Sequence, residues 1–365
     1  GPSLHVDVAS DSLAAREGTL FLHTVRVENM VESVQVTAEI VESSRQYCTF
    51  HPAIQYEPSH LRVLTIGMNV SSVKVRFVAT DNNIAEDPLQ QMLCRVTYTN
   101  TTLGTPKEGL TSVTNDDSAG AALRWDNLET PVLPLRFREG EGRGYEIVLK
   151  SKPIGTIEVY TNVTKGSGSS SRIPFSVNPV KLEFTSKNWN VPQQVNVSST
   201  HDNIDGALDE EKFTVTHTIN KTAIHGSADF VFSDVEDLRV VATVTDIDTA
   251  GIALLDNVQA MTANEGAAAV SFTVQALKSK PVSTVTVRIT STCARLVVSP
   301  SQFEVAPSEW QTVKKIVDVT AEEGIEQGPC SVHLVAESVD PLNPKYNHTH
   351  SQTAVQASVE FGIIQ

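Results

Sequence analysis

Two motifs in this chain each occur twice, at almost the same spacing. Residues 114–120 (Thr-Asn-Asp-Asp-Ser-Ala-Gly) return 131 positions later as residues 245–251 (Thr-Asp-Ile-Asp-Thr-Ala-Gly), and residues 149–153 (Leu-Lys-Ser-Lys-Pro) return 128 positions later as residues 277–281. Two different motifs with nearly one period indicate tandem copies of a single structural unit. In a chain of 365 residues this predicts three domains, at residues 3–118, 119–249 and 250–365, named here units 1, 2 and 3.

The hydrophobic pattern within the units is that of β-strands. Val73, Val75 and Phe77 alternate with Lys74 and Arg76, which is the period of a half-buried antiparallel strand. Val, Thr and Ser recur throughout, and each unit carries a Glu-Gly turn after a short first strand. About seven such strands in each unit, separated by Gly, Pro and Asn, predict an all-β fold: three tandem immunoglobulin-like β-sandwiches of about seven antiparallel strands each.

The four cysteines follow the repeat. Cys48 and Cys94 lie in unit 1, Cys293 and Cys330 take similar places in unit 3, and unit 2 lacks a cysteine at both places. Because bonded partners are lost together, the sequence predicts the disulfides Cys48–Cys94 and Cys293–Cys330, and with them an oxidising, extracellular or cell-surface location. The alternative is four unrelated buried thiols.

Glycosylation and charge add weaker signals. Alternation in residues 195–197 (Val-Asn-Val) turns the asparagine outward, where a glycan could stand. The six Asn-x-Ser/Thr sequons are at Asn69, Asn100, Asn162, Asn196, Asn220 and Asn347. The net charge of −15 argues against nucleic acid as a partner, since phosphates require a basic face. No apolar run approaches the roughly 20 residues that cross a bilayer, so we expect no membrane insertion by this segment.

The order of several short motifs resembles that of Calx-β domains. The motifs are the Glu-Gly turn, residues 202–205 (Asp-Asn-Ile-Asp), the strand after Glu211, and the closing residues 245–248 (Thr-Asp-Ile-Asp). Unit 2 also resembles the cadherin-like repeats of large surface proteins. The resemblance implies extracellular repeat domains in all three units.

The resemblance further implies calcium as a cofactor. In calcium-binding Calx-β domains, carboxylates from these turns converge at one end of the sandwich, and Ca²⁺ takes six to eight oxygen ligands. The implied ligands of unit 2 are Glu141, Asp202, the carbonyl of Ile204, Asp205, Glu211, Asp246 and Asp248. Those of unit 1 are Glu17, Asp81, Asn82, Glu86, Asp87, Asp116 and Asp117. Unit 3 lacks the closing acids. The alternative is that these Asp and Asn residues only form turns that face water.

The sequence contains none of the familiar catalytic motifs, so we expect no enzyme. Its leading interpretation is a segment of a larger cell-surface or secreted protein that acts as an adhesive or spacer stalk, stiffened by calcium. The junctions at 118/119 and 249/250 are almost without spacer, which favours a stiff rod. For an adhesive stalk we expect a protein partner on the same or an opposing cell surface. The alternatives are a receptor ectodomain that recognises a protein through loops 43–58 and 99–109 of unit 1, and a secreted hydrolase with a deep cleft between units.

Overall fold

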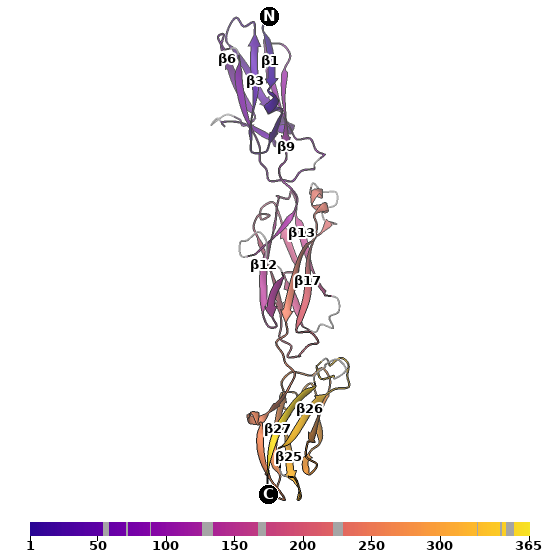
Figure 1. Cartoon of the computed structure of the whole chain (residues 1–365). Helices are drawn as coiled ribbons and strands as arrows, with labels where there is room; N and C mark the ends of the chain where they lie inside the picture. Colours follow the sequence, from indigo (N-terminus) through magenta and orange to yellow (C-terminus); the bar gives the residue numbers. More distant parts are fainter. Residues whose placement is uncertain are drawn as a thin grey trace.

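The structure is a computed structural model that describes residues 1–53, 58–70, 72–87, 89–125, 134–166, 173–221, 229–326, 328–343, 345–347 and 354–365. Figure 1 shows three β-sandwiches in a row, with the two chain termini at opposite ends of an elongated molecule. This confirms the all-β fold of three tandem immunoglobulin-like sandwiches. The six sheets lie two by two within the ranges of the three units.

Unit 1 consists of a four-stranded and a five-stranded sheet. The first has the order β1-β3-β7-β5, with bounds Ser3–Val8, Leu20–Glu28, Val73–Ala79 and Cys48–Phe50. The second has the order β2-β9-β8-β4-β6, with bounds Ala14–Arg16, Lys107–Thr114, Leu93–Thr99, Val34–Ile40 and Leu61–Ile66.

Unit 2 repeats this arrangement strand for strand. Its four-stranded sheet has the order β10-β12-β16-β14, with bounds Ala121–Arg124, Gly142–Leu149, Gln193–Ser199 and Phe175–Asn178. Its five-stranded sheet has the order β11-β18-β17-β13-β15, with bounds Leu135–Arg138, Leu238–Thr245, Glu210–Ile219, Ile157–Lys165 and Lys181–Phe184.

Unit 3 has the same two sheets. The order β19-β21-β25-β23 has the bounds Ile252–Leu254, Val270–Leu277, Lys315–Ala321 and Leu296–Ser299. The order β20-β27-β26-β22-β24 has the bounds Ala260–Asn264, Val355–Ile364, Cys330–Glu337, Val285–Ser291 and Gln302–Val305. Within the described part of the chain, no helix is long and apolar enough to cross a membrane.

Each unit has nine strands in its described residues, where the sequence predicts about seven. One additional strand arises because the first strand of each unit is split between the two sheets. Its second half (β2, β11 or β20) pairs parallel with the last strand of the unit, so one pair per unit departs from the expected antiparallel pattern. Such a switch covers an edge in both sheets of the sandwich.

The alternating strands bury one face as predicted. In β7, Val75 and Phe77 are buried while Lys74 and Arg76 are exposed. Each unit buries its own set of about twenty apolar side chains, and these sets form three separate cores. Each unit therefore has its own hydrophobic stabilisation, as separately packed domains do.

Both predicted disulfides are present. Cys48 at the start of β5 bonds Cys94 in β8, which links the two sheets of unit 1. Cys293, in the turn after β22, bonds Cys330 at the start of β26. The two bridges are not in the same place: Leu296, not Cys293, occupies the ladder position of Cys48, opposite the last residue of the adjacent strand.

Unit 2 places an aromatic pair where unit 1 has its disulfide. The registers of β14 with β16 and of β17 with β18 match Phe175 to Cys48 and Phe213 to Cys94. These two rings are stacked, with centroids 4.2 Å apart and planes at 10°. A packed aromatic pair thus joins the sheets of unit 2 where a covalent bond joins those of unit 1.

Candidate metal centre

Units 1 and 2 each carry an acidic tip at the end that faces the next unit. In unit 1 the tip is formed by the turn at Glu17, the loop after β7 and the residues that follow β9. Gly18 adopts φ +72°, a conformation that favours glycine. Backbone hydrogen bonds from Glu17 N to Thr114 O and from Gly18 N to Ala79 O, 3.2 and 2.9 Å long, hold the three segments together.

The carboxylates of Glu17, Asp116 and Asp117 converge in tip site 1. One oxygen from each lies within 4.8 Å of the others. Glu17 is only 5 % exposed, whereas Asp116 is more open and pairs with Arg16 at 2.9 Å. A buried carboxylate next to two others requires compensation for its charge.

Tip site 1 and the adjacent Glu86 contain several buried carboxylate oxygens without a hydrogen-bond partner among the described residues. They are both oxygens of Glu17, Oε2 of Glu86 and Oδ2 of Asp117. The Asp116 backbone N–H lies near Glu17 and lowers its pKa, but no hydrogen bond of ordinary geometry reaches either oxygen. Buried oxygens of this kind are rare in folded proteins and mark sites where an ion or water completes the structure.

Burial and like charge raise the pKa values in tip site 1. Burial, and secondly the Glu86 carboxylate, raise the pKa of Glu17 to about 7. Burial, followed by the neighbouring Asp116, also raises the pKa of Asp117. The site therefore stores electrostatic repulsion that a cation would relieve.

The corresponding cluster of unit 2, tip site 2, consists of Glu139, His201 and Asp248, whose ligand atoms also lie within 4.8 Å of one another. Glu139 is 3 % exposed; its Oε1 accepts a hydrogen bond from Asp202 N, and burial raises its pKa to about 7. His201 Nε2 lies 2.9 Å from Asp248 Oδ1, and this hydrogen bond raises the pKa of His201. Oε2 of Glu139 and Oδ2 of Asp248 are buried without a partner in the described residues.

The structure corrects the prediction of Glu141 as the ligand from the Glu-Gly turn. Its side chain is about half exposed, accepts a hydrogen bond from Arg138 N and lies 3.8 Å from Arg143. Glu139 is the inward residue, because it directly precedes Gly140 at φ +79° and its N–H donates to Thr245 O, as Glu17 N does to Thr114 O. The backbone turn therefore identifies Glu139-Gly140, and not Glu141-Gly142, as the counterpart of Glu17-Gly18.

The other predicted ligands of unit 2 mainly hold the tip loops. Asp246 accepts hydrogen bonds from Asp248 N and Gly206 N through its two oxygens. Asp202 Oδ1 accepts from Ile204 N. Asp205 Oδ2 accepts a hydrogen bond from Ala250 N of unit 3, and burial raises the pKa of Asp205. Glu211 is buried on β17 opposite Val244 and belongs to neither cluster.

In unit 1 the remaining predicted residues surround tip site 1. Glu86 Oε1 accepts a hydrogen bond from Asn82 Nδ2, and its charge acts on both Glu17 and Asp117. Asp81 is exposed, and its charge acts on Asp117. Asp87 instead caps a turn, accepting from Leu89 N. The sequence did not predict His201, which takes the place in unit 2 that Asp81 has in unit 1.

The two donor sets fit different ions. Tip site 1 offers only carboxylate oxygens, the ligands that Ca²⁺ prefers at 2.3–2.6 Å, so two on opposite sides of the ion would be about 5 Å apart. The three ligand atoms lie within 4.8 Å of one another, close enough for one ion to contact all of them. Tip site 2 replaces a carboxylate by an imidazole that is already hydrogen-bonded to Asp248, and it fits calcium less well.

Three predicted glycosylation sites have exposed side chains: Asn69, Asn162 and Asn196. Val195 and Val197, on either side of Asn196, are fully buried, as the alternation predicts.

The other three sequons are less open. The side-chain nitrogens of Asn100 and Asn220 donate to Gln35 O and to Glu158 Oε2. Asn347 is 4 % exposed, which argues against the prediction of a glycan there, because its side chain faces packed protein instead of solvent.

No protein-family model and no curated protein matches the chain. Solved tandem-domain structures are similar over its length: titin domains A168-A170 (12 % identity, 93 % of this chain and 94 % of that one, TM-score 0.29), and mouse clustered PcdhgC3 EC1-3 (7 % identity, 90 % and 89 %, TM-score 0.28). A third is Dpr2 Ig1-Ig2 in complex with DIP-Theta Ig1-Ig3 (7 % identity, 100 % and 99 %, TM-score 0.23). At these TM-scores the likeness carries no argument about function, and the fold assignment rests on the sheet topology.

Proposed function

We propose that this chain is a non-enzymatic segment of an extracellular or cell-surface protein and acts as an adhesive or spacer stalk that binds calcium at the tip of unit 1. The observation that carries the proposal is the set of four buried, unpaired carboxylate oxygens on Glu17, Glu86 and Asp117. Two disulfides and exposed sequons support a location in the secretory pathway. A stalk of this kind presents a binding surface to a protein partner on the same or an opposing cell.

The position of tip site 1 connects an ion to the shape of the stalk. Asp116 and Asp117 lie in the segment that leads into unit 2. The same tip contributes Asn83, whose carbonyl accepts a hydrogen bond from Lys152 N of unit 2 at 2.6 Å. A calcium ion would supply positive charge to Glu17, Glu86 and Asp117, and these residues would hold the loop that contacts unit 2.

The receptor alternative receives less support from the loops of unit 1. Tyr47, Phe50 and Leu103, the large apolar side chains described in loops 43–58 and 99–109, are 6, 4 and 8 % exposed. Because these side chains point into the core, the described part of the two loops offers little apolar surface to a partner, and this favours the stalk.

Thermal unfolding of the full chain in calcium and in chelator tests the proposal. Calcium should raise the melting temperature of unit 1 by several degrees, because a ligand bound only by the folded state stabilises it. Magnesium at the same concentration is the control for ionic strength. The variant Glu17→Gln should fold in chelator and lose the shift; a wild-type protein without any shift would contradict the calcium site.

A further inference from the structure

The junctions between units 1 and 2 and between units 2 and 3 share one backbone arrangement. Asn83 O accepts from Lys152 N at the first junction and Asn203 O accepts from Lys280 N at the second, both at 2.6 Å. The two asparagines have φ +60° and +64°. This match fixes the equivalence of the neighbouring positions: Ala85 in unit 1 corresponds to Asp205 in unit 2.

The opposite side of each junction can be matched in the same way. Asp229 accepts a hydrogen bond from Ile154 N, and Asn343 accepts one from Val282 N, two residues after the repeated Lys-Pro segment begins. Two residues further along, Val231 corresponds to Lys345. The next position holds the buried rings of Phe232 and Tyr346, which are 1 and 2 % exposed.

At the second junction, Lys345 and Asp205 form an ion pair between units 3 and 2, named here the polar lock. Lys345 Nζ lies 3.4 Å from Asp205 Oδ1 and 3.6 Å from Asp209 Oδ1. Asp205 Oδ2 accepts a hydrogen bond from the N–H of Ala250, the first residue of unit 3, at 2.6 Å. The Asp205 side chain is 13 % exposed and that of Lys345 28 %, so solvent screens this ion pair less than an open surface pair.

Behind the lock, the Tyr346 hydroxyl donates to Ser279 O at 3.1 Å, inside unit 3. The hydroxyl holds the segment that carries Lys345 against the base of unit 3. The equivalent ring in unit 2, Phe232, has no hydroxyl, and Ser151 Oγ is buried without a partner in the described residues.

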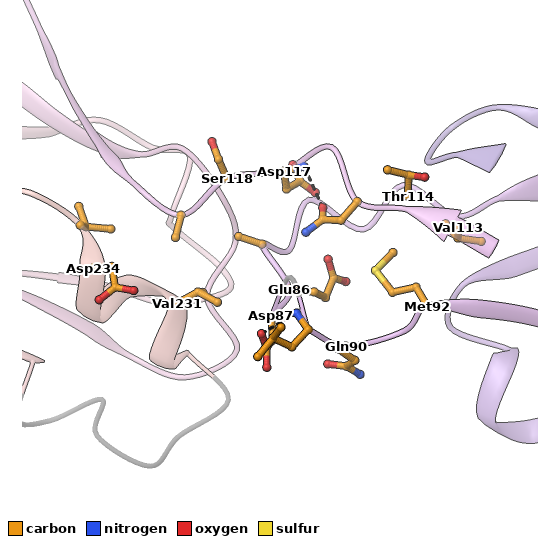
Figure 2. A pocket seen from close by; sticks show the side chains of 15 residues that line it. Glu86, Asp87, Gln90, Met92, Val113, Thr114, Asp117, Ser118, Val231 and Asp234 are labelled. Carbon is orange, nitrogen blue, oxygen red and sulfur yellow. Dashed lines mark hydrogen bonds between the residues drawn. The ribbon is translucent and has the colours of Figure 1, made fainter. Parts of the chain in front are cut away.

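At the first junction none of these polar contacts can form. Ala85 and Val231 have apolar side chains, and both line a cavity of about 780 Å³ between units 1 and 2. Figure 2 shows Val231 and Asp234 of unit 2 on one side of this cavity, with Glu86 and Asp87 of unit 1 on the other. None of the described residues that line it is basic, so no ammonium group lies among their carboxylates.

We infer that Lys345, bound to Asp205, locks unit 3 onto unit 2, and that the stalk bends at the junction between units 1 and 2. The pair Asp205/Lys345 is replaced there by Ala85/Val231, so among the described residues the shared backbone hydrogen bond is the one that links the tip of unit 1 to unit 2. This goes beyond the proposed function and does not depend on calcium. Domains joined by a small interface move relative to each other unless a specific contact restrains them.

Single-molecule energy transfer on the full chain in chelator tests the inference. Dyes attached through non-cysteine chemistry at the exposed positions Val63, Val180 and Val297 report on one junction at a time and leave the disulfides intact. The distance distribution should be broader between positions 63 and 180 than between 180 and 297. The variant Lys345→Met, which keeps the length of the side chain, should broaden the second distribution to the width of the first.

The transplant Ala85→Asp with Val231→Lys is the matched gain-of-contact variant. It should narrow the distribution across the first junction, and the narrowing should be lost at high salt, since the new contact is an ion pair. Equal widths in the wild type, or no broadening in a folded Lys345→Met protein, would overturn the inference. Calcium added afterwards tests the proposed function separately: without an effect at the first junction the calcium proposal fails, while the lock stands.

Discussion

Units 1 and 2 have matching strand order and tip hydrogen bonds, yet at facing positions they exchange side chains in pairs. The disulfide Cys48–Cys94 of unit 1 becomes the stacked pair Phe175 and Phe213 in unit 2. Both members change together because the two side chains contact each other across the sandwich. The difference teaches that the pair, and not the single residue, is what the fold requires at these positions.

A second exchange is reciprocal. In unit 1, His23 on β3 forms a hydrogen bond with Tyr98 on β8, 2.8 Å long. In unit 2, the counterpart of β3 is β12, which carries Tyr145, and the counterpart of β8 is β17, which carries His217. These two side chains form a hydrogen bond of 2.7 Å. Strand registers place the two pairs at equivalent positions.

Each histidine of these pairs also bonds a threonine through its other ring nitrogen, Thr111 in unit 1 and Thr161 in unit 2. Both ring nitrogens are therefore engaged in each unit. The hydrogen bond between the sheets is kept although its two ends have changed places.

The acidic tips differ in which loop positions carry the carboxylates. Glu86 of unit 1 is matched by Gly206 in unit 2, and Asp81 is matched by His201. Unit 2 in turn has Asp202 and Asp246 where unit 1 has Asn82 and Asn115, so the carboxylates near its buried glutamate occupy other positions, and an imidazole lies among them. A buried pair must keep its packing, whereas a tip in contact with solvent can carry its carboxylates at different loop positions and keep the fold; its ion affinity changes instead.

Reduction of the disulfides should produce the largest difference between the two units. The bridge of unit 1 spans 46 residues, and loop entropy predicts that its loss costs unit 1 about 4 kcal/mol in free energy of unfolding. Unit 2 has no cysteine and should keep its stability. Hydrogen exchange of the full chain with and without reductant resolves the units, with Cys48→Ala/Cys94→Ala as the control; equal loss in units 1 and 2 would contradict this account.

Acid should reveal the histidines of the exchanged pairs. Burial lowers the pKa of His23 and of His217 to about 4, whereas an unfolded histidine binds a proton below about 6.5. The unfolded state takes up the proton first. Each histidine therefore lowers the free energy of unfolding of its own unit by about 3 kcal/mol as the pH falls from about 6.5 to 4. Glu17 acts in the opposite direction, because its pKa is raised in the folded state.

A variant isolates the histidine contribution. Unit 3 has Phe272 and Leu334 at the equivalent positions, so His23→Phe/Tyr98→Leu gives unit 1 an apolar pair that the fold already uses. Urea unfolding at pH 7 and pH 4 should show a smaller loss in this variant than in the wild type, since the effect of Glu17 is common to both. An identical pH dependence would mean that His23 does not titrate as its burial requires.

The smallest effect is expected at the tip of unit 2. The substitution His201→Asp gives it the carboxylate that unit 1 has as Asp81, and the calcium dissociation constant of unit 2 should fall by about tenfold, because affinity rises with the number of charged ligands. Asp81→His in unit 1 is the matched reverse change and should weaken tip site 1. Calcium titrations of both variants by calorimetry measure the two effects, and a change of the same sign in both would contradict the comparison.

The repeat, the β-pattern and the cysteines were sufficient to predict the fold and both disulfides. The sequence could not show that Phe175 and Phe213 replace a bridge, because their contact depends on strand register across 38 residues. It also assigned Glu141 instead of Glu139, since both precede a glycine and only the backbone turn selects the inward residue. Lys345 and Asp205 are 140 residues apart in the sequence, so no local sequence pattern predicts their contact.

Direct calcium binding to the full chain tests the central claim. Isothermal titration at neutral pH, on wild-type protein and on Glu17→Gln, should show a calcium site in the wild type that the variant has lost, with both proteins folded by circular dichroism. Wild-type protein that binds no calcium at millimolar concentration, or a variant that binds it equally well, would show that the buried oxygens of Glu17, Glu86 and Asp117 serve another purpose.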